Sequence, residues 1–168
     1  MPFTTINQLT YFTFDIFPRN KIGHGLFTRH GGVSPQPWAS LNMGGLVDDT
    51  RENVIENRKR LFESVDRPVE SLFDVWQVHS ADVVATTLPR PLDEAHQKAD
   101  GILTNLPEIT LLMRFADCVP IMLYDPVKRA VGLVHAGWQG TVKLIAAEAV
   151  HQMQVQYGCR PADILAEI

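Results

Sequence analysis

The hydrophobic positions of the chain follow two spacings, one typical of strands and one typical of helices. Alternating or continuous apolar runs predict strands at residues 9–14, 25–28, 72–78, 81–87, 110–116, 121–124, 130–134 and 163–168. Helical spacing predicts two amphipathic helices, at residues 50–65 and 141–157. Because strand and helix patterns alternate only in part, we expect an α/β or α+β fold with mixed β-sheets.

Local signals set the expected ends of these elements. Asp49 precedes the first helix, and Glu52 stands three residues later, so we expect Asp49 to be the N-cap. Gly158 is expected to end the second helix, because glycine readily adopts the left-handed conformation of a helix terminus. Pro89 and Pro91 interrupt the strand pattern that precedes them.

Composition narrows the class of protein. The chain has 168 residues, 45% of them hydrophobic and 20% charged, which predicts one globular domain over residues 1–168. Its formal charge of −4 lacks the clustered basic excess that binds nucleic acid. No apolar run reaches the ~20 residues of a membrane span. We therefore expect no nucleic-acid partner and no membrane insertion, and no pattern sets an oligomeric state.

Cysteine content and the termini suggest where the protein works. Two cysteines, Cys118 and Cys159, do not make a disulfide framework. The first residues lack the basic and apolar regions of a signal peptide, so a reducing cytoplasm is expected. The last predicted strand simply ends at Ile168, which suggests a chain truncated at its C-terminus.

Three residues of types that commonly bind metal ions lie at strand ends or interruptions: His79, Cys118 and His135. They are too far apart in sequence for a zinc finger, so only tertiary folding can bring them together. Two histidines and one cysteine would leave tetrahedral zinc an open position, as in catalytic zinc sites. Taken alone, a buried cysteine and ordinary polar histidines explain the same residues, and that alternative stays open.

Several short motifs occur together and in order. They are Phe27–Ser34, Ser40–Gly44, Glu56–Arg58, Gln77–His79, Ala99–Gly101, Ala116–Pro120 and His135–Trp138. As a set they closely resemble the YfiH/YlmD family, also called the polyphenol oxidase or laccase-domain family. The resemblance spans most of the chain, and the Ala-Asp-Cys and His-Ala-Gly-Trp motifs are its most specific parts.

This resemblance implies both a fold and a function. The fold would be a layered α/β/β/α domain, and the protein a purine nucleoside enzyme. It would cleave adenosine, inosine, guanosine and methylthioadenosine with inorganic phosphate, and deaminate adenosine with water. His79, Cys118 and His135 match the zinc ligands of the family.

Further residues are candidates for the same site. Asp117, beside the candidate ligand and catalytic residue Cys118, is a candidate for moving a proton in catalysis, and orienting the loop backbone is the alternative role. Arg29 is a candidate for holding phosphate or ribose oxygens, with an ordinary surface arginine as the alternative. Asn42 and Arg58 are the other substrate-binding candidates. Gln139 stands where the family usually has arginine, which removes a possible anion contact.

Three other functions use the same residues. In a metal-independent cysteine hydrolase, Cys118 would be the nucleophile and His135 its base. In a copper-dependent polyphenol oxidoreductase, copper would replace zinc, although six histidines argue against an array of several coppers. A metal-binding interaction domain would keep the ligands but have no substrate pocket.

Overall fold

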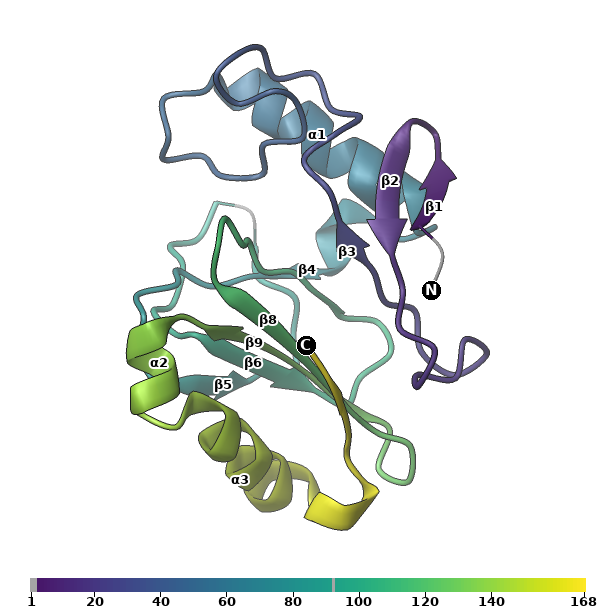
Figure 1. Ribbon diagram of the computed structural model, residues 1–168, viewed down its shortest axis with the longest axis vertical. Coiled ribbons are helices and arrows are strands. Elements are labelled where there is room, and N and C mark those ends of the chain that lie inside the picture. Colours follow the sequence, from purple (N-terminus) through teal and green to yellow (C-terminus); the bar gives the residue numbers. More distant parts are fainter. Residues whose placement is uncertain (1–2, 92) are drawn as a thin grey trace. The chain divides into compact units, whose positions relative to one another are not determined.

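The computed structural model describes residues 3–91 and 93–168. Contacts between residues divide the chain into two compact units, Met1–Val69 and Glu70–Ile168 (Figure 1). The prediction of one domain over residues 1–168 stays a prediction.

The first unit combines a small antiparallel sheet with one long helix. The sheet has the strand order β1–β2–β3, from Phe3–Ile6, Leu9–Phe12 and Leu26–Phe27. The first of these strands was not predicted, because its residues are mostly exposed. Helix α1 spans Arg51–Ser64, which confirms the helix predicted at 50–65.

The N-cap of α1 is Thr50, so the prediction of Asp49 was wrong by one residue. The Thr50 hydroxyl accepts a hydrogen bond from the Asn53 N–H at 3.4 Å. Asp49 instead accepts from the Ser34 hydroxyl at 2.6 Å and from Asn42 Nδ2 at 2.9 Å. Its carboxylate therefore holds the preceding loop against the start of the helix.

Asn57 on α1 fixes the same loop from the helix side. Its side chain is fully buried, and Oδ1 accepts from the Val33 N–H at 2.8 Å. Its Nδ2 donates to Ser34 Oγ and to the backbone oxygens of Ser40 and Asn42, at 2.8–3.2 Å. A loop without regular structure is thus held by one buried amide, which satisfies backbone groups that would otherwise lack partners.

The second unit is built on a mixed five-stranded sheet with the order β10–β8–β9–β6–β5. Its strands are β5 Val83–Ala85, β6 Gly101–Thr104, β8 Val119–Asp125, β9 Ala130–Ala136 and β10 Leu165–Glu167. Strands β5 and β6 are parallel and the other pairs antiparallel. A separate parallel pair joins β4 Leu72–Phe73 to β7 Thr110–Leu111.

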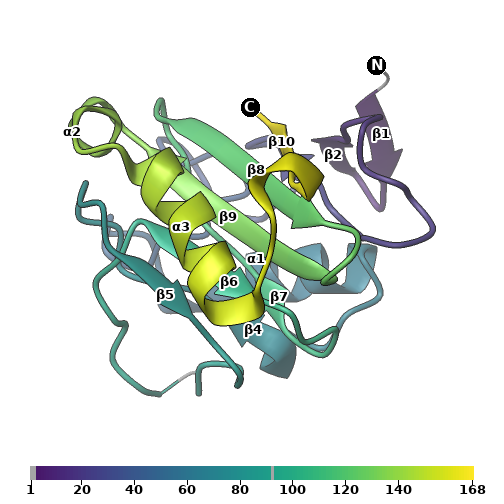
Figure 2. The same cartoon turned by 90° about the horizontal axis from the view of Figure 1, so that it is seen from below.

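Both faces of the five-stranded sheet are covered, so neighbouring residues of β6 and β9 alternate between two cores. Leu103 and Val134 pack with the buried residues of helix α3 (Ile145–Tyr157), which lies across the sheet in Figure 2. Ile102 and Leu133 belong to the other core, which includes Phe73 on β4. Because β6 and β9 are buried on both faces, their sequences are nearly continuous runs of apolar residues.

The helix predicted at 141–157 is in fact two helices. Helix α2 spans Trp138–Val142, and α3 follows after Leu144, whose φ of 63° is left-handed and ends the helical run. Two 3₁₀ turns, Val69–Ser71 and Pro161–Asp163, complete the elements. The predicted α+β class with mixed sheets is confirmed, and none of the described helices is long and apolar enough to cross a membrane.

Asp49 makes the stability of the chain sensitive to acid. The hydrogen bond from Ser34 is the largest cause of its lowered pKa; burial opposes it, and Asn42, Asn53 and Thr50 bring the pKa to about 2. An unfolded aspartate has a pKa of about 3.9. The stabilising contribution is therefore present above about pH 4 and is lost as the pH falls toward 2.

We predict that Asp49→Asn lowers stability at neutral pH, because its amide would face N–H and O–H donors. The difference in free energy of unfolding between the wild type and Asp49→Asn should then become smaller below about pH 4. Urea unfolding at a series of pH values measures it. Asp48→Asn, at the exposed neighbour, is the control and should follow the wild type. A constant gap down to the acid transition would contradict the role given to Asp49.

Candidate metal centre

Pairing between β8 and β9 brings Cys118 and His135 to the same end of the sheet. Val119 lies opposite Ala136, and Pro120 lies opposite His135. Cys118 directly precedes β8, while His135 is the penultimate residue of β9. The predicted strand interruption at residues 117–120 is therefore the place where β8 begins.

His79 reaches this end of the sheet from the segment between β4 and β5. Its φ of 58° is left-handed, which is uncommon for a residue other than glycine. The backbone oxygen of His79 accepts a hydrogen bond from Lys143 Nζ at 3.1 Å. The predicted strands 72–78 and 81–87 are shorter than expected, because the chain bends at His79 between β4 and β5.

The potential ligand atoms of His79, Cys118 and His135 all lie within 4.8 Å of one another. His135 is buried, whereas the other two are partly exposed. The two imidazole ring centroids are 4.9 Å apart, and the ring of Phe115 is 5.6 Å from that of His135. Two imidazole nitrogens and one thiolate sulfur are donor types that zinc binds in proteins.

Asp100, just before β6, joins these residues through its buried carboxylate. Oδ1 lies 2.8 Å from Nδ1 of His135, and the backbone N–H groups of Val78, His79 and Ser80 donate to the two oxygens. Burial alone would raise the pKa of Asp100, but bonds from Ser80, His135 and Val78 outweigh it and the pKa is lowered. The sequence analysis missed this residue, although the Ala99–Gly101 motif contains it.

Gly137 leaves the space that the triad needs. A Cβ at this position would lie 2.6 Å from Nδ1 of His79 and 3.1 Å from Sγ of Cys118. The backbone does not require glycine, since its φ of −72° and ψ of 169° suit any residue. The absence of a side chain therefore serves the close approach of the two candidate ligands.

Burial and acidic neighbours favour the thiol form of Cys118 over the thiolate. Burial raises the pKa of Cys118, and the carboxylates of Asp117 and Asp100 raise it further. The thiol donates to Oδ1 of Asp117, with sulfur and oxygen 3.6 Å apart. The side chain of Asp117 is exposed beside the triad, where it is free to meet a ligand from solvent.

The three predicted substrate-binding residues all lie in the first unit and hold its loops. Arg29 Nε donates to the backbone oxygen of Ala39 at 2.7 Å, and Arg58 Nη2 donates to that of Met43 at 3.3 Å. Asn42 Nδ2 donates to Asp49, as described above. Their expected contacts with substrate stay predictions. Gln139 is exposed in the first turn of α2.

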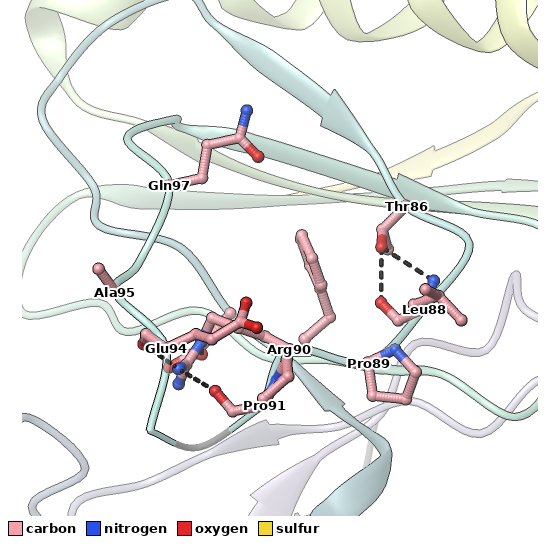
Figure 3. A pocket seen from close by; sticks show the side chains of 10 residues that line it. Thr86, Leu88, Pro89, Arg90, Pro91, Glu94, Ala95 and Gln97 are labelled. Carbon is pink, nitrogen blue, oxygen red and sulfur yellow. Dashed lines mark hydrogen bonds and ion pairs between the residues drawn. The ribbon is translucent and has the colours of Figure 1, made fainter.

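A separate cavity of about 320 Å³ lies around the segment that follows β5 (Figure 3). Figure 3 shows Arg90 and Glu94 on one side of it and Thr86 and Leu88 on the other. The buried Arg90 guanidinium is engaged by Asp74 at 2.7 Å and by the backbone oxygen of Glu94 at 2.8 Å. None of the predicted site residues lines this cavity.

Fold and site together define an α+β protein with a His–Cys–His candidate metal centre at one end of a mixed sheet. Residues 23–168 match the family described as multi-copper polyphenol oxidoreductase laccase, and the chain belongs to this family. The predicted resemblance to YfiH and YlmD proteins is confirmed by the relatives that follow.

Similar sequences include proteins named purine nucleoside phosphorylase. The chain is 40% identical over 150 residues to Purine nucleoside phosphorylase YlmD of Bacillus subtilis (strain 168), covering 86% of this chain and 54% of that protein. It is 36% identical over 161 residues to Purine nucleoside phosphorylase LACC1 of Homo sapiens, covering 94% and 36% respectively. The chain spans about half the length of most curated relatives that it matches.

Solved structures show the same fold. The hypothetical protein YfiH of Bacillus licheniformis superposes with a TM-score of 0.86 at 34% identity, over 98% of this chain and 63% of that one. YlmD of Geobacillus stearothermophilus superposes with a TM-score of 0.80 at 40% identity, over 84% of this chain and 55% of that one.

We predict that Gly137→Ala weakens metal binding while the protein stays folded. The added methyl group would displace His79 or Cys118, and the loss should be about tenfold or more, as when a ligand is no longer held in place. Titration of zinc against a competing chelator measures it. Gly45→Ala is the matched control, because nothing lies within 4 Å of its added Cβ. Equal zinc affinity in the two variants would show that the space at Gly137 is not needed.

Proposed function

We propose that this chain is the metal-binding part of a zinc-dependent purine nucleoside phosphorylase, which also deaminates adenosine. The observation that carries the proposal is the convergence of His79, Cys118 and His135 at one end of the sheet. The names of the similar proteins supply the class of reaction. The proposed substrates are adenosine, inosine, guanosine and methylthioadenosine, with inorganic phosphate.

Zinc is the metal that we favour over copper. Among the described residues, the triad is the only group of three or more histidine, cysteine and acidic side chains placed to hold an ion. An array of several coppers would need more such groups. Three protein ligands with one position left open are typical of catalytic zinc, which when bound polarises a substrate oxygen or activates water.

The other proposed site residues act on the substrate. The exposed Asp117 carboxylate, beside the triad, exchanges a proton with the purine base. Arg29, Asn42 and Arg58 contribute donors for phosphate and ribose oxygens. Since both cysteines are free, a reducing compartment such as the cytoplasm suits the protein.

One observation weighs against a cysteine hydrolase. Its nucleophile would need a thiolate, but burial and the neighbouring carboxylates raise the pKa of Cys118. A bound cation, in contrast, would stabilise the Cys118 thiolate directly.

The phosphorylase assignment predicts that cleavage of inosine depends on phosphate. Zinc-loaded protein should release hypoxanthine and ribose 1-phosphate only when inorganic phosphate is present, whereas deamination of adenosine should proceed without it. His135→Ala should abolish both activities, because it removes the buried ligand. Chromatography of the bases and nucleosides measures both reactions.

The control for that assay is Gly45→Ala, which should retain the wild-type rates. Equal cleavage of inosine with and without phosphate would exclude phosphorolysis. Absence of turnover in a folded protein that binds one zinc ion would favour the metal-binding interaction domain instead.

A labelling experiment distinguishes a metal ligand from a nucleophile at Cys118. Iodoacetamide should modify this residue slowly in the zinc-loaded protein and faster after chelation, because a sulfur atom bound to the metal is less available to react. Peptide mass spectrometry gives the rate, with the buried Cys159 as the internal reference. Rapid labelling at neutral pH that chelation leaves unchanged would support the hydrolase.

A further inference from the structure

One carboxylate contacts two of the three candidate ligands at once. Asp100 has no exposed surface, and its Oδ1 is 2.8 Å from Nδ1 of His135 and 3.0 Å from the N–H of His79. Its Oδ2 accepts from the N–H groups of Val78 at 3.1 Å and Ser80 at 2.6 Å, and from the Ser80 hydroxyl at 2.9 Å. All five groups around the carboxylate therefore act as donors.

The bond to His135 determines which ring nitrogen is free. A carboxylate accepts hydrogen bonds, so Nδ1 of His135 carries the proton and Nε2 presents its lone pair. Only a nitrogen without a proton binds a metal ion. The same contact fixes the orientation of the ring.

The remaining bonds hold the backbone at His79. Three consecutive N–H groups, from residues 78 to 80, converge on the carboxylate. Such a row of N–H groups, with one residue in the left-handed region, forms a concave site for an anion. The φ of 58° at His79 is therefore stabilised by the charge of Asp100.

Asp100 is itself held from both sides. Its N–H donates to the backbone oxygen of Asp82 at 3.0 Å, and its own oxygen accepts from the N–H of His135 at 2.7 Å. The backbone of Asp100, which carries the carboxylate, is thus fixed between β9 and the segment that contains His79.

We propose that Asp100 is the positioning residue of the metal centre, which selects the Nδ1–H tautomer of His135 and fixes the bend that presents His79. Nothing else among the described contacts links these two ligands through one side chain. The inference rests on the metal site of the proposed function, but it concerns the geometry of the site before any metal or nucleoside binds.

Asp100→Asn is the informative substitution, because it keeps the shape and changes one acceptor into a donor. If the amide nitrogen replaced Oδ2, it would face two backbone N–H groups, neither of which can turn into an acceptor. If it replaced Oδ1, it would face one backbone N–H and His135, whose ring can exchange its proton between nitrogens. The second arrangement costs less, and it leaves Nε2 protonated.

The experiment compares tautomer and metal affinity in the full chain. With ¹⁵N-labelled histidine, at a pH where imidazole is neutral, the metal-free wild type should show the Nδ1–H form of His135. The signal is assigned by its loss in His135→Gln. Asp100→Asn should show the Nε2–H form, and its affinity for zinc alone should fall by about 10–100-fold. Chemical denaturation checks that the variant is folded.

The matched control is Asp125→Asn, at another fully buried aspartate. Asp125 accepts from the N–H groups of Val127 at 2.8 Å and Lys128 at 3.0 Å, and no contact joins it to the triad. This variant also replaces a buried carboxylate with an amide, and it should keep the wild-type tautomer and zinc affinity. An equal loss of affinity in Asp125→Asn would overturn the proposal, because general destabilisation would then explain the effect.

The wild-type tautomer remains decisive if Asp100→Asn does not fold. It is measured in the wild type and assigned with His135→Gln, and a Nε2–H form of His135 would overturn the proposal. Ser80→Ala removes only one donor to Oδ2, so it should keep the tautomer and hold zinc affinity within about threefold of wild type. Neither measurement uses a nucleoside. Failure of phosphorolysis would therefore not change the conclusion about Asp100, and failure of the Asp100 proposal would not exclude phosphorolysis.

Discussion

The register between β8 and β9 is the constraint on which the site depends. Seven residue pairs join the two strands, and one of them sets Pro120 opposite His135. Because side chains alternate between the faces of a sheet, a slip of one residue would move His135 to the opposite face and exchange Leu133 with Val134 between the two cores. The pairing that buries the core therefore also places Cys118 beside His135.

Much of this arrangement was predictable from the spacing of apolar residues. Helix α1 and strands β8 and β9 were found because each buries one or both faces along a regular period. The convergence of the triad was predicted because its members are metal-ligand residue types at strand ends, and the resemblance to the family favoured metal binding over a buried cysteine and ordinary histidines. Both predictions rest on residue type and order, which the sequence contains directly.

Features that depend on tertiary contacts were not predictable in the same way. The break at Leu144 interrupts a perfect helical spacing, and no glycine or proline marks it. Thr50 and Asp49 are both good N-cap residues, so only the loop contacts of Asp49 decide between them. Asp100 lies 21 residues from His79 and 35 from His135, and its role exists only once the strands are paired.

The buried contact between Asp74 and Arg90 has a consequence for the influence of salt. Exposed pairs such as Lys59 with Glu63 are weakened by dissolved ions, since water and salt reach both charges. The guanidinium of Arg90 and the carboxylate of Asp74 are almost completely shielded from solvent. Screening therefore affects their attraction little, and Arg90 keeps its bonds to Asp74 and to the backbone oxygens of Pro91 and Glu94 at ionic strengths that weaken exposed pairs.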